Sequence, residues 1–180
     1  MIAQGSSESE ILQACRDNNR QAQEILYRKY AAKMFHICLS YTADRDSAKD
    51  ILQESFVKIF KGIHTFSGEK SLEGWMRRIV TNTAIDFYRK EKRIRFFQSE
   101  SSDSIESIST PANQLTAFST ENILHHLKRL PEGARLVFHM FAVEGYSHKE
   151  IAGKLSISEG TSKSQFNRAR TLLQEWLSLS

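Results

Sequence analysis

Apolar residues recur every three or four positions along most of the chain, a spacing that is typical of helices with one buried face. The pattern is clear between residues 20 and 41, where Leu26, Tyr30 and Met34 fall on one side of a helical wheel. The predicted helices cover about 7–17, 20–41, 44–63 and 71–95, and then about 120–129, 132–143, 147–155 and 159–177. We therefore expect an all-α fold.

A polar stretch near the middle of the chain, residues 98–111, interrupts this pattern. Six of its fourteen residues are serines, three are acidic and only two are large and apolar. A segment of this composition cannot bury enough apolar surface to fold alone. The sequence thus predicts two small four-helix domains, at 6–95 and 119–178, joined by a flexible acidic linker at 96–118.

The composition is that of a globular protein. Hydrophobic residues make up 40% of the 180 residues, which is enough to build a core. No apolar run approaches the roughly 18–20 residues that span a bilayer, and the N-terminal residues do not form a secretory signal. Cys15 and Cys38 have no CxxC partner, so we expect reduced, buried thiols whose role stays open. These features predict a cytoplasmic protein without membrane insertion.

Positive charge is concentrated in one helix-length segment. The chain carries a net charge of +4, yet residues 75–95 alone hold seven basic and two acidic side chains. Residues 96–119 hold three acidic side chains and no basic one. A focused basic stripe indicates a polyanionic partner such as nucleic acid. On charge alone, a solvated helix face is an equally good explanation.

The fourth predicted helix has two distinct faces when its residues are placed at roughly 100° intervals. The core face holds Met76, Ile79, Val80, Thr83, Ala84 and Phe87. The opposite face holds Trp75, Arg78, Asn82, Asp86, Arg89 and Arg93. Arginines neutralise phosphates, Asn and Asp read base edges, and a tryptophan ring can stack on an unpaired base. We favour a nucleic-acid interface for the whole face, although Trp75 alone fits the edge of a core equally well.

The third predicted helix, which Asp44 or Asp46 caps, has a polar edge beside its apolar face. Asp50, Gln53 and Glu54 follow one another on this edge at helical spacing. Such an edge is usually an ordinary solvated face. Because it adjoins a basic nucleic-acid helix, it is also a candidate docking site for a protein partner.

The last two predicted helices form a helix-turn-helix. Ser147 and Glu150 match the S-x-x-E capping box that begins a short helix, and a three-residue turn at 156–158 leads into the next one. In such a unit the second helix enters the major groove of DNA. The residues expected to contact DNA are Thr161, Lys163, Ser164, Gln165, Asn167 and Arg168.

Patterns that indicate catalysis or metal binding are weak in this sequence. The six histidines form no HExxH motif and no Cys/His metal spacing. The chain has no phosphate-binding glycine loop and no GxSxG motif. We therefore predict that the protein is not an enzyme and has no cofactor and no metal site. A DNA-processing enzyme, the alternative, would need a carboxylate set or nucleophile that the basic segment does not offer.

Three motifs resemble the extracytoplasmic-function group of bacterial sigma-70 factors, the promoter-specificity subunits of RNA polymerase. The first is DSAKDILQESF at 46–56, and the second is WMRRIVTNTAIDFYRK at 75–90. The third is Leu130-Pro131, followed by EIA at 150–152 and GTSKSQFNRAR at 160–170. The resemblance covers about residues 8–175, with the linker in the expected place.

The resemblance implies a role for each motif. Asp50, Gln53 and Glu54 would dock the clamp of the largest polymerase subunit. The helix that begins near Trp75 would melt and hold the minus-ten element of promoter DNA. The helix-turn-helix would read the minus-thirty-five element, and its flank would contact the flap of the second-largest subunit. An anti-sigma protein is a further expected partner.

Two residues depart from the pattern of this family. Ser162 stands where an aliphatic residue is usual, so we expect slightly weaker packing of the recognition helix. Gln165 stands where arginine is frequent, which leaves the promoter specificity open. The main alternative is a stand-alone helix-turn-helix regulator, which would bind duplex DNA without polymerase.

Overall fold

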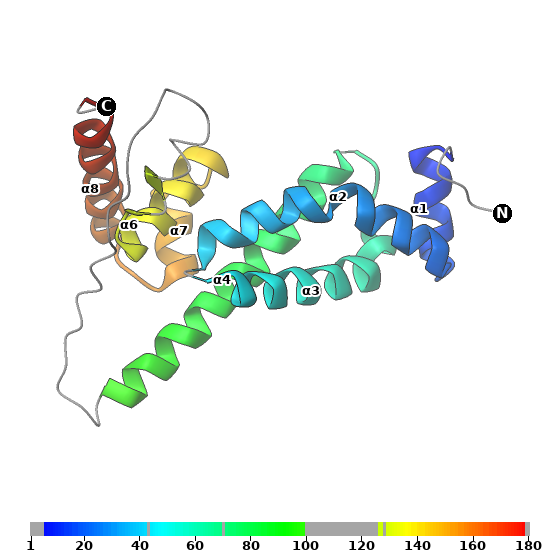
Figure 1. Cartoon of the computed structure of the whole chain (residues 1–180), viewed down its shortest axis with the longest axis horizontal. Coiled ribbons are helices and arrows are strands. Elements are labelled where there is room, and N and C mark those ends of the chain that lie inside the picture. Colours follow the sequence, from blue (N-terminus) through cyan, green and yellow to red (C-terminus); the bar gives the residue numbers. More distant parts are fainter. Residues whose placement is uncertain (1–5, 43, 70, 100–125, 128, 179–180) are drawn as a thin grey trace. The chain divides into compact units, whose positions relative to one another are not determined.

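A computed structural model describes residues 6–42, 44–69, 71–99, 126–127 and 129–178. Within these ranges every regular element is a helix (Figure 1), which confirms the prediction of an all-α fold. The chain divides into two compact units, Met1–Tyr88 and Arg89–Ser180, which are described separately below.

The first unit contains the four helices that the apolar spacing predicted. They are α1 (Glu8–Arg16), α2 (Arg20–Tyr41), α3 (Arg45–Gly62) and α4 (Leu72–Ser99), with a 3-10 turn η1 (Ile63–Thr65) after α3. Helix α4 continues beyond its predicted end near Arg95 and into the second unit. Residues 96–99, which we assigned to the linker, are therefore helical, and the rest of the predicted linker lies outside the described residues.

Short polar side chains fix the helix beginnings. The Ser7 hydroxyl accepts from the Glu10 amide, and the Glu10 carboxylate accepts from the Ser7 amide, which completes a capping box for α1. Asp44, rather than Asp46, caps α3 by accepting from the amides of Asp46 and Ser47 at 2.9 and 2.7 Å. The hydrogen bond from the Ser47 amide is the main reason that the pKa of Asp44 lies below its ordinary value.

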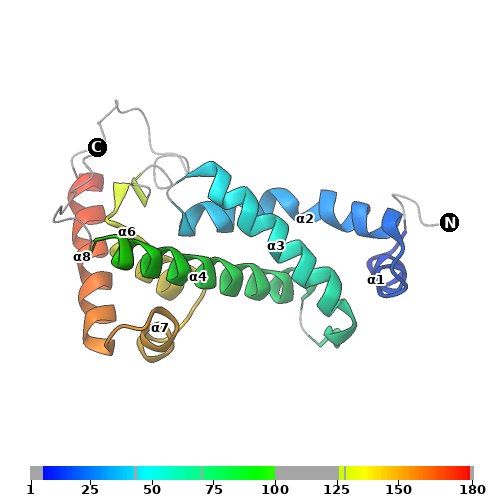
Figure 2. The ribbon, with the colours of Figure 1, turned by 90° about the horizontal axis from the view of Figure 1, so that it is seen from below.

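The core of the first unit lies between α2, α3 and α4, which run lengthwise beside one another in Figures 1 and 2. Met34, Ile51, Ile59, Met76 and Val80 are fully buried there. Helix α1 packs on the beginning of α2 through the buried residues of its own apolar stripe (Figure 2). Burial of one apolar stripe on each helix leaves the opposite faces of α3 and α4 available for partners.

The second unit contains α6 (Glu132–Phe138), a π-helical segment η2 (His139–Val143), α7 (His148–Leu155) and α8 (Glu159–Ser178). The helix predicted over 132–143 therefore changes to π-helical geometry at His139. The helix predicted over 120–129 lies almost entirely outside the described residues. Packing of α6 on α8 buries Leu130, Ala134, Ala169 and Leu173, with Leu127, Phe138, Leu172 and Trp176 partly buried beside them.

The helix-turn-helix has the predicted form. Ser147 and Glu150 complete the capping box of α7, with the Glu150 amide 3.3 Å from the Ser147 hydroxyl. Ser156 then takes a left-handed conformation, with φ of 55°, which ends α7 sharply. The Ser158 hydroxyl accepts from the Thr161 amide at 2.9 Å and so begins α8.

Candidate functional site

The polar face of α4, defined by Trp75, Arg78, Asn82, Asp86 and Arg89, lies opposite the buried face of that helix. Arg78, Asp86 and Arg89 are exposed, and Asn82 is half-buried. The side chain of Arg93, the sixth predicted member, lies outside the described residues. The geometry therefore permits several of these side chains to reach one extended ligand at the same time.

The buried face of α4 is wider than the sequence indicated. Met76, Val80, Thr83 and Ala84 are buried as predicted, whereas Ile79 and Phe87 are only half-buried. In addition, the structure buries Thr81 and Ile85. The wheel assigned these two residues to neither face because both lie on the flank between the core face and the polar face.

Trp75 is half-buried and packs on the segment that precedes α4. Its ring centroid lies 5.6 Å from that of Phe66, at an interplanar angle of 49°. Gly62 lies beside the same ring: a Cβ atom at this glycine would be 3.7 Å from Trp75 Cζ2, an ordinary contact distance. Trp75 thus lies at the edge of the core, with part of its surface still open to solvent.

The candidate docking surface on α3 comprises the predicted residues Asp50, Gln53 and Glu54 together with the neighbouring Val57. All four side chains are exposed, and Glu54 pairs with Lys58 at 2.7 Å. Sequence reasoning missed Val57, which is 51% exposed one turn beyond Gln53 and Glu54. Its position could have indicated it, because Val57 is an apolar residue on the polar edge of the helix, away from the stripe that forms the core. The surface therefore offers acidic, amide and apolar groups together.

The recognition helix α8 exposes most of the residues predicted to contact DNA. Thr161, Lys163, Ser164, Asn167 and Arg168 are exposed on the side away from the buried Ala169 and Leu173. Thr171, which the sequence analysis did not include, is exposed one turn beyond Asn167 on the same face. The helical spacing of four residues could have indicated it.

Gln165, which was also predicted to contact DNA, has a different environment from the other members of that set. It is only half-exposed, and its side chain folds against α6. Gly133 lies beside it there: a Cβ atom at this glycine would lie 3.5 Å from the amide carbon of Gln165. Its Oε1 atom is buried and has no hydrogen-bond partner among the described residues. The side chain lies on the flank of α8 that packs on α6.

Ser162 is the residue at which we expected slightly weaker packing of α8. Its side chain is completely buried, and its hydroxyl lies 3.0 Å from Nδ1 of His148 on α7. A polar contact between the two helices therefore takes the place of the aliphatic packing that the family pattern led us to expect.

An ion pair lies on the first turn of the recognition helix. Lys163 Nζ lies 2.7 Å from the Glu159 carboxylate, one turn before it. The hydrogen bond from Lys163 is the main cause that lowers the pKa of Glu159, and the charges of His148 and Lys149 act in the same direction. Because the pair is exposed, a phosphate group can compete with Glu159 for this lysine.

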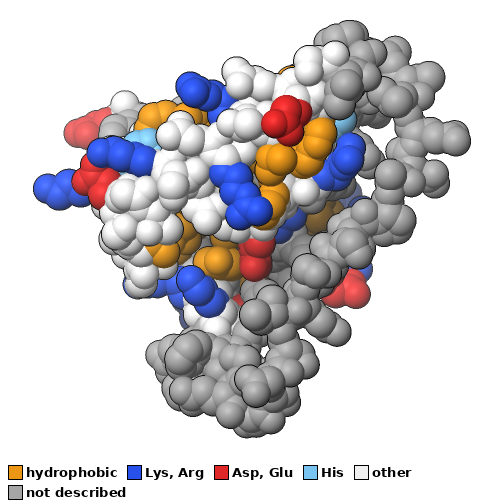
Figure 3. All heavy atoms as spheres, turned by 90° about the vertical axis from the view of Figure 1, so that its left-hand side faces the viewer, with side chains coloured by type: hydrophobic (Ala, Val, Ile, Leu, Met, Phe, Trp, Pro, Cys, Tyr) orange, Lys and Arg blue, Asp and Glu red, His pale blue; other side chains and the backbone are white. Residues whose placement is uncertain are grey.

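The face shown in Figure 3 mixes Lys and Arg side chains with acidic and hydrophobic ones, wherever the structure describes it. Charge alone therefore does not mark an interface on that face. The positions of individual side chains on α4 and α8 define the candidate surfaces more sharply.

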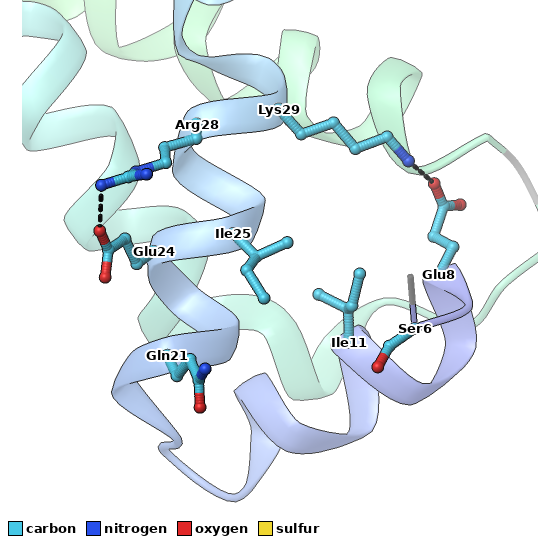
Figure 4. Close-up of a pocket in the computed structure, with 8 residues that line it drawn as sticks. All are labelled: Ser6, Glu8, Ile11, Gln21, Glu24, Ile25, Arg28 and Lys29. Carbon is cyan, nitrogen blue, oxygen red and sulfur yellow. Dashed lines mark hydrogen bonds and ion pairs between the residues drawn. The ribbon is translucent and has the colours of Figure 1, made fainter. Parts of the chain in front are cut away.

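A groove between α1 and α2 is shown in Figure 4. Its charged side chains pair with one another, Glu8 with Lys29 at 3.0 Å and Glu24 with Arg28 at 2.6 Å.

Over the described part of the chain, no three His, Cys, Asp or Glu side chains are arranged to hold a metal ion. No helix among the described residues is long and apolar enough to cross a membrane.

Comparison with known families identifies both units. Residues 26–94 match the family model described as Sigma-70 region 2, and residues 120–173 match that described as Sigma-70, region 4. The chain therefore belongs to the sigma-70 family, whose members direct RNA polymerase to promoters and start transcription there.

The relatives and solved structures refine this assignment. An ECF RNA polymerase sigma-E factor of Haemophilus influenzae is 25% identical, over 96% of each chain. The ECF RNA polymerase sigma factor SigM of Bacillus subtilis is 27% identical, over 83% of this chain and 91% of the relative. Sigma factor RpoE of Bartonella quintana, solved with the anti-sigma factor NepR, shares the fold with a TM-score of 0.52, at 24% identity over 87% of this chain and 97% of that one. The 180-residue chain itself therefore belongs to the extracytoplasmic-function group of sigma factors.

Proposed function

We propose that this sigma factor divides its work among three surfaces: the docking surface on α3, the polar face of α4 and the exposed face of α8. The observation that carries this proposal is the sharp separation of buried and exposed residues on α4. Met76, Val80 and Ala84 are completely buried on one side, while Arg78, Asp86 and Arg89 are exposed on the other. A helix that places charged, amide and aromatic groups along one open face is suited to a nucleic-acid strand.

The polar face of α4 binds and holds the melted minus-ten element. Arg78 and Arg89 neutralise backbone phosphates, which gives affinity without sequence preference. Asn82 and Asp86 offer amide and carboxylate groups to the edges of unpaired bases. Trp75 is half-buried against Phe66 and Gly62, so its open surface is held rigidly for a flipped-out base to stack on.

The docking surface on α3 binds the clamp of the largest polymerase subunit. Asp50 and Glu54 favour a basic partner surface, and Gln53 can donate and accept hydrogen bonds. The exposed Val57 adds an apolar contact at the same place. Burial of this side chain on binding removes apolar surface from water, which favours association.

The helix-turn-helix reads the minus-thirty-five element as duplex DNA, with α8 in the major groove. Thr161, Lys163, Ser164, Asn167 and Arg168 supply contacts to phosphates and base edges. We assign Gln165 to the packing between α6 and α8 instead, because its amide lies against Gly133. The flank of this domain contacts the flap of the second-largest subunit.

The remaining roles follow from those of sigma factors in general. The protein acts in the cytoplasm, where polymerase and chromosome meet, and it has no catalytic activity of its own because the polymerase synthesises the RNA. An anti-sigma protein controls it, as NepR binds the sigma factor of Bartonella quintana.

Promoter-directed transcription tests the proposal. The purified chain is mixed with sigma-free bacterial core polymerase and a library of upstream fragments from its own genome. We expect discrete start sites that disappear when the chain is omitted. Stable binding to duplex DNA with no polymerase association and no new start sites would instead indicate a stand-alone regulator.

A further inference from the structure

A side chain at the C-terminal end of α1 joins this helix to the segment that follows η1. Arg16, the last residue of α1, donates a hydrogen bond from Nη2 to the main-chain carbonyl of Phe66 at 2.9 Å. Three apolar residues of α1, Ile11, Leu12 and Cys15, are buried, so the helix that carries Arg16 is itself held by packing. The contact therefore restrains Phe66 from a helix that lies 50 residues earlier in the chain.

Phe66 is the last buried residue before a short exposed stretch. Its side chain is only 7% exposed, and its amide donates to the Ile63 carbonyl at 3.3 Å. Residues 67–69, which follow it directly, are all exposed. Exposed segments with few packing contacts are the first parts of a fold to move. The hydrogen bond from Arg16 thus restrains the main chain at the point where the packing ends.

The ring of Phe66 in turn supports the ring of Trp75. The two ring centroids lie 5.6 Å apart, at an interplanar angle of 49°. The main chain of Trp75 is fixed separately by the first turn of α4, where its amide donates to the Ser71 carbonyl at 3.1 Å. The orientation of the half-buried indole ring therefore depends on Phe66, and the placement of Phe66 depends on Arg16.

We propose that Arg16 is a positioning residue for opening of the minus-ten element, because it holds Phe66, and through Phe66 the ring of Trp75, in the pose on which a flipped-out base stacks. This inference rests on the proposed role of Trp75 in that element. A stacking surface that is already rigid binds a base without the entropic cost of ordering it. Helix α1 precedes residues 26–94, so the inference gives a function to a part of the chain outside the match to Sigma-70 region 2.

A direct contact between the Arg16 guanidinium and a DNA phosphate is the competing explanation, because Arg16 is exposed. The two explanations differ in how changes at Arg16 and Trp75 combine. If Arg16 acts through Trp75, removal of the indole ring makes the Arg16 side chain irrelevant to promoter opening. If Arg16 binds a phosphate independently, its loss adds to the loss of the indole ring.

The test is a double-mutant cycle with the full chain, core polymerase and a promoter found by transcription mapping. Arg16→Ala, Trp75→Leu and the double variant are compared with the wild type. Trp75→Leu keeps an apolar side chain beside Phe66 but removes the stacking ring, and Arg16→Lys keeps a charged donor. The matched control is Arg20→Ala, at an exposed arginine that begins α2. Permanganate reactivity of unpaired thymines reports opening, and circular dichroism establishes that each variant is folded.

We expect Trp75→Leu to reduce opening by about fivefold or more, because one base loses its stacking partner. Arg16→Ala should reduce opening by about three- to tenfold, with a far smaller change in polymerase affinity. The double variant should open the promoter as poorly as Trp75→Leu alone. Arg16→Lys should recover most of the loss because its ammonium group can also donate to the Phe66 carbonyl, and Arg20→Ala should behave like the wild type.

Two results would overturn the proposal: wild-type opening in Arg16→Ala, or an additive loss in the double variant. Trp75→Leu separates this failure from a failure of the proposed function. If Trp75→Leu impairs opening and Arg16→Ala does not, the positioning role is wrong and the stacking role stands. If Trp75→Leu opens the promoter normally, the stacking role of Trp75 is wrong, and the positioning role that rests on it is wrong as well.

Discussion

Lys58 on α3 donates a hydrogen bond from Nζ to the Oγ1 atom of Thr83 on α4, across 3.2 Å. The same ammonium group pairs with Glu54 at 2.7 Å, and the Thr83 hydroxyl donates to the Ile79 carbonyl at 2.9 Å. A short series of polar contacts therefore connects the docking surface on α3 to the helix that carries the polar face. This link fixes how the two surfaces are spaced within the first unit.

Two threonines on α4 allow a matched test of this link. Thr83→Val removes the hydroxyl that Lys58 binds, so the free energy of unfolding should fall by about 1 kcal/mol. Thr81→Val removes a buried hydroxyl that has no hydrogen-bond partner among the described residues, so that free energy should stay unchanged or rise by up to about 1 kcal/mol. Urea denaturation followed by circular dichroism measures both. Equal losses in the two variants would show that the Lys58 contact is not stabilising.

Polymerase binding should depend on the docking surface. Changing Gln53 and Glu54 together to alanine removes two exposed polar groups, so the fold stays intact while affinity for core polymerase falls by about tenfold. Titration of a labelled chain with core polymerase gives the affinity. The matched control changes Gln21 and Glu24 on α2, an amide and a carboxylate that are also exposed. Unchanged affinity in the Gln53 and Glu54 variant would refute the assignment.

Promoter opening should depend on the polar face of α4. We expect alanine at Asn82 and Arg89 to reduce opening by about tenfold or more, because both groups contact the melted strand. Polymerase affinity should change far less. Permanganate reactivity of unpaired thymines reports opening, and Arg28→Ala on α2 serves as a control. Equal loss of opening and of polymerase binding would mean that this face has another role.

The recognition helix allows a comparison between neighbouring positions. Asn167→Ala removes an exposed side chain that faces DNA, and should weaken binding to the specific duplex by about five- to a hundredfold. Gln165→Ala removes a side chain that lies against Gly133, and should change that binding by less than about threefold. Fluorescence anisotropy with specific and scrambled duplexes measures both effects. A larger effect at Gln165 than at Asn167 would reverse our placement of these two residues.

The two cysteines should be unreactive in the folded protein. Burial raises the pKa of the Cys15 thiol to about 11 and that of Cys38 to about 12. N-ethylmaleimide should therefore label both slowly at about pH 7.5 and rapidly in denaturant, since the thiolate is the reactive form. Because the folded-state pKa values exceed those of the unfolded chain, the resulting stabilisation is complete below about pH 8.5 and is lost as the pH rises toward the folded-state values. Rapid labelling of the native protein would contradict the burial.

The sequence determined the helices and their open faces with little ambiguity. Helix α2 has the predicted bounds, and the residues that begin α3 and α7 were among those that the capping patterns indicated. Asp50, Gln53 and Glu54 are exposed as the wheel predicted. These features could be predicted because helix periodicity and capping depend on residues within a few positions of one another.

Contacts between helices decided the rest. The burial of Thr81 and the turning of Gln165 toward Gly133 depend on neighbours that are distant in the sequence. The bond between Ser162 and His148 likewise joins two helices across the turn. A wheel drawn for one helix divides its surface into an inner and an outer face, but it does not show where a second helix covers the flank. The local pattern of the sequence therefore determined the elements and their outward faces, and only the tertiary packing decided which flanking residues a neighbouring helix covers and which stay exposed.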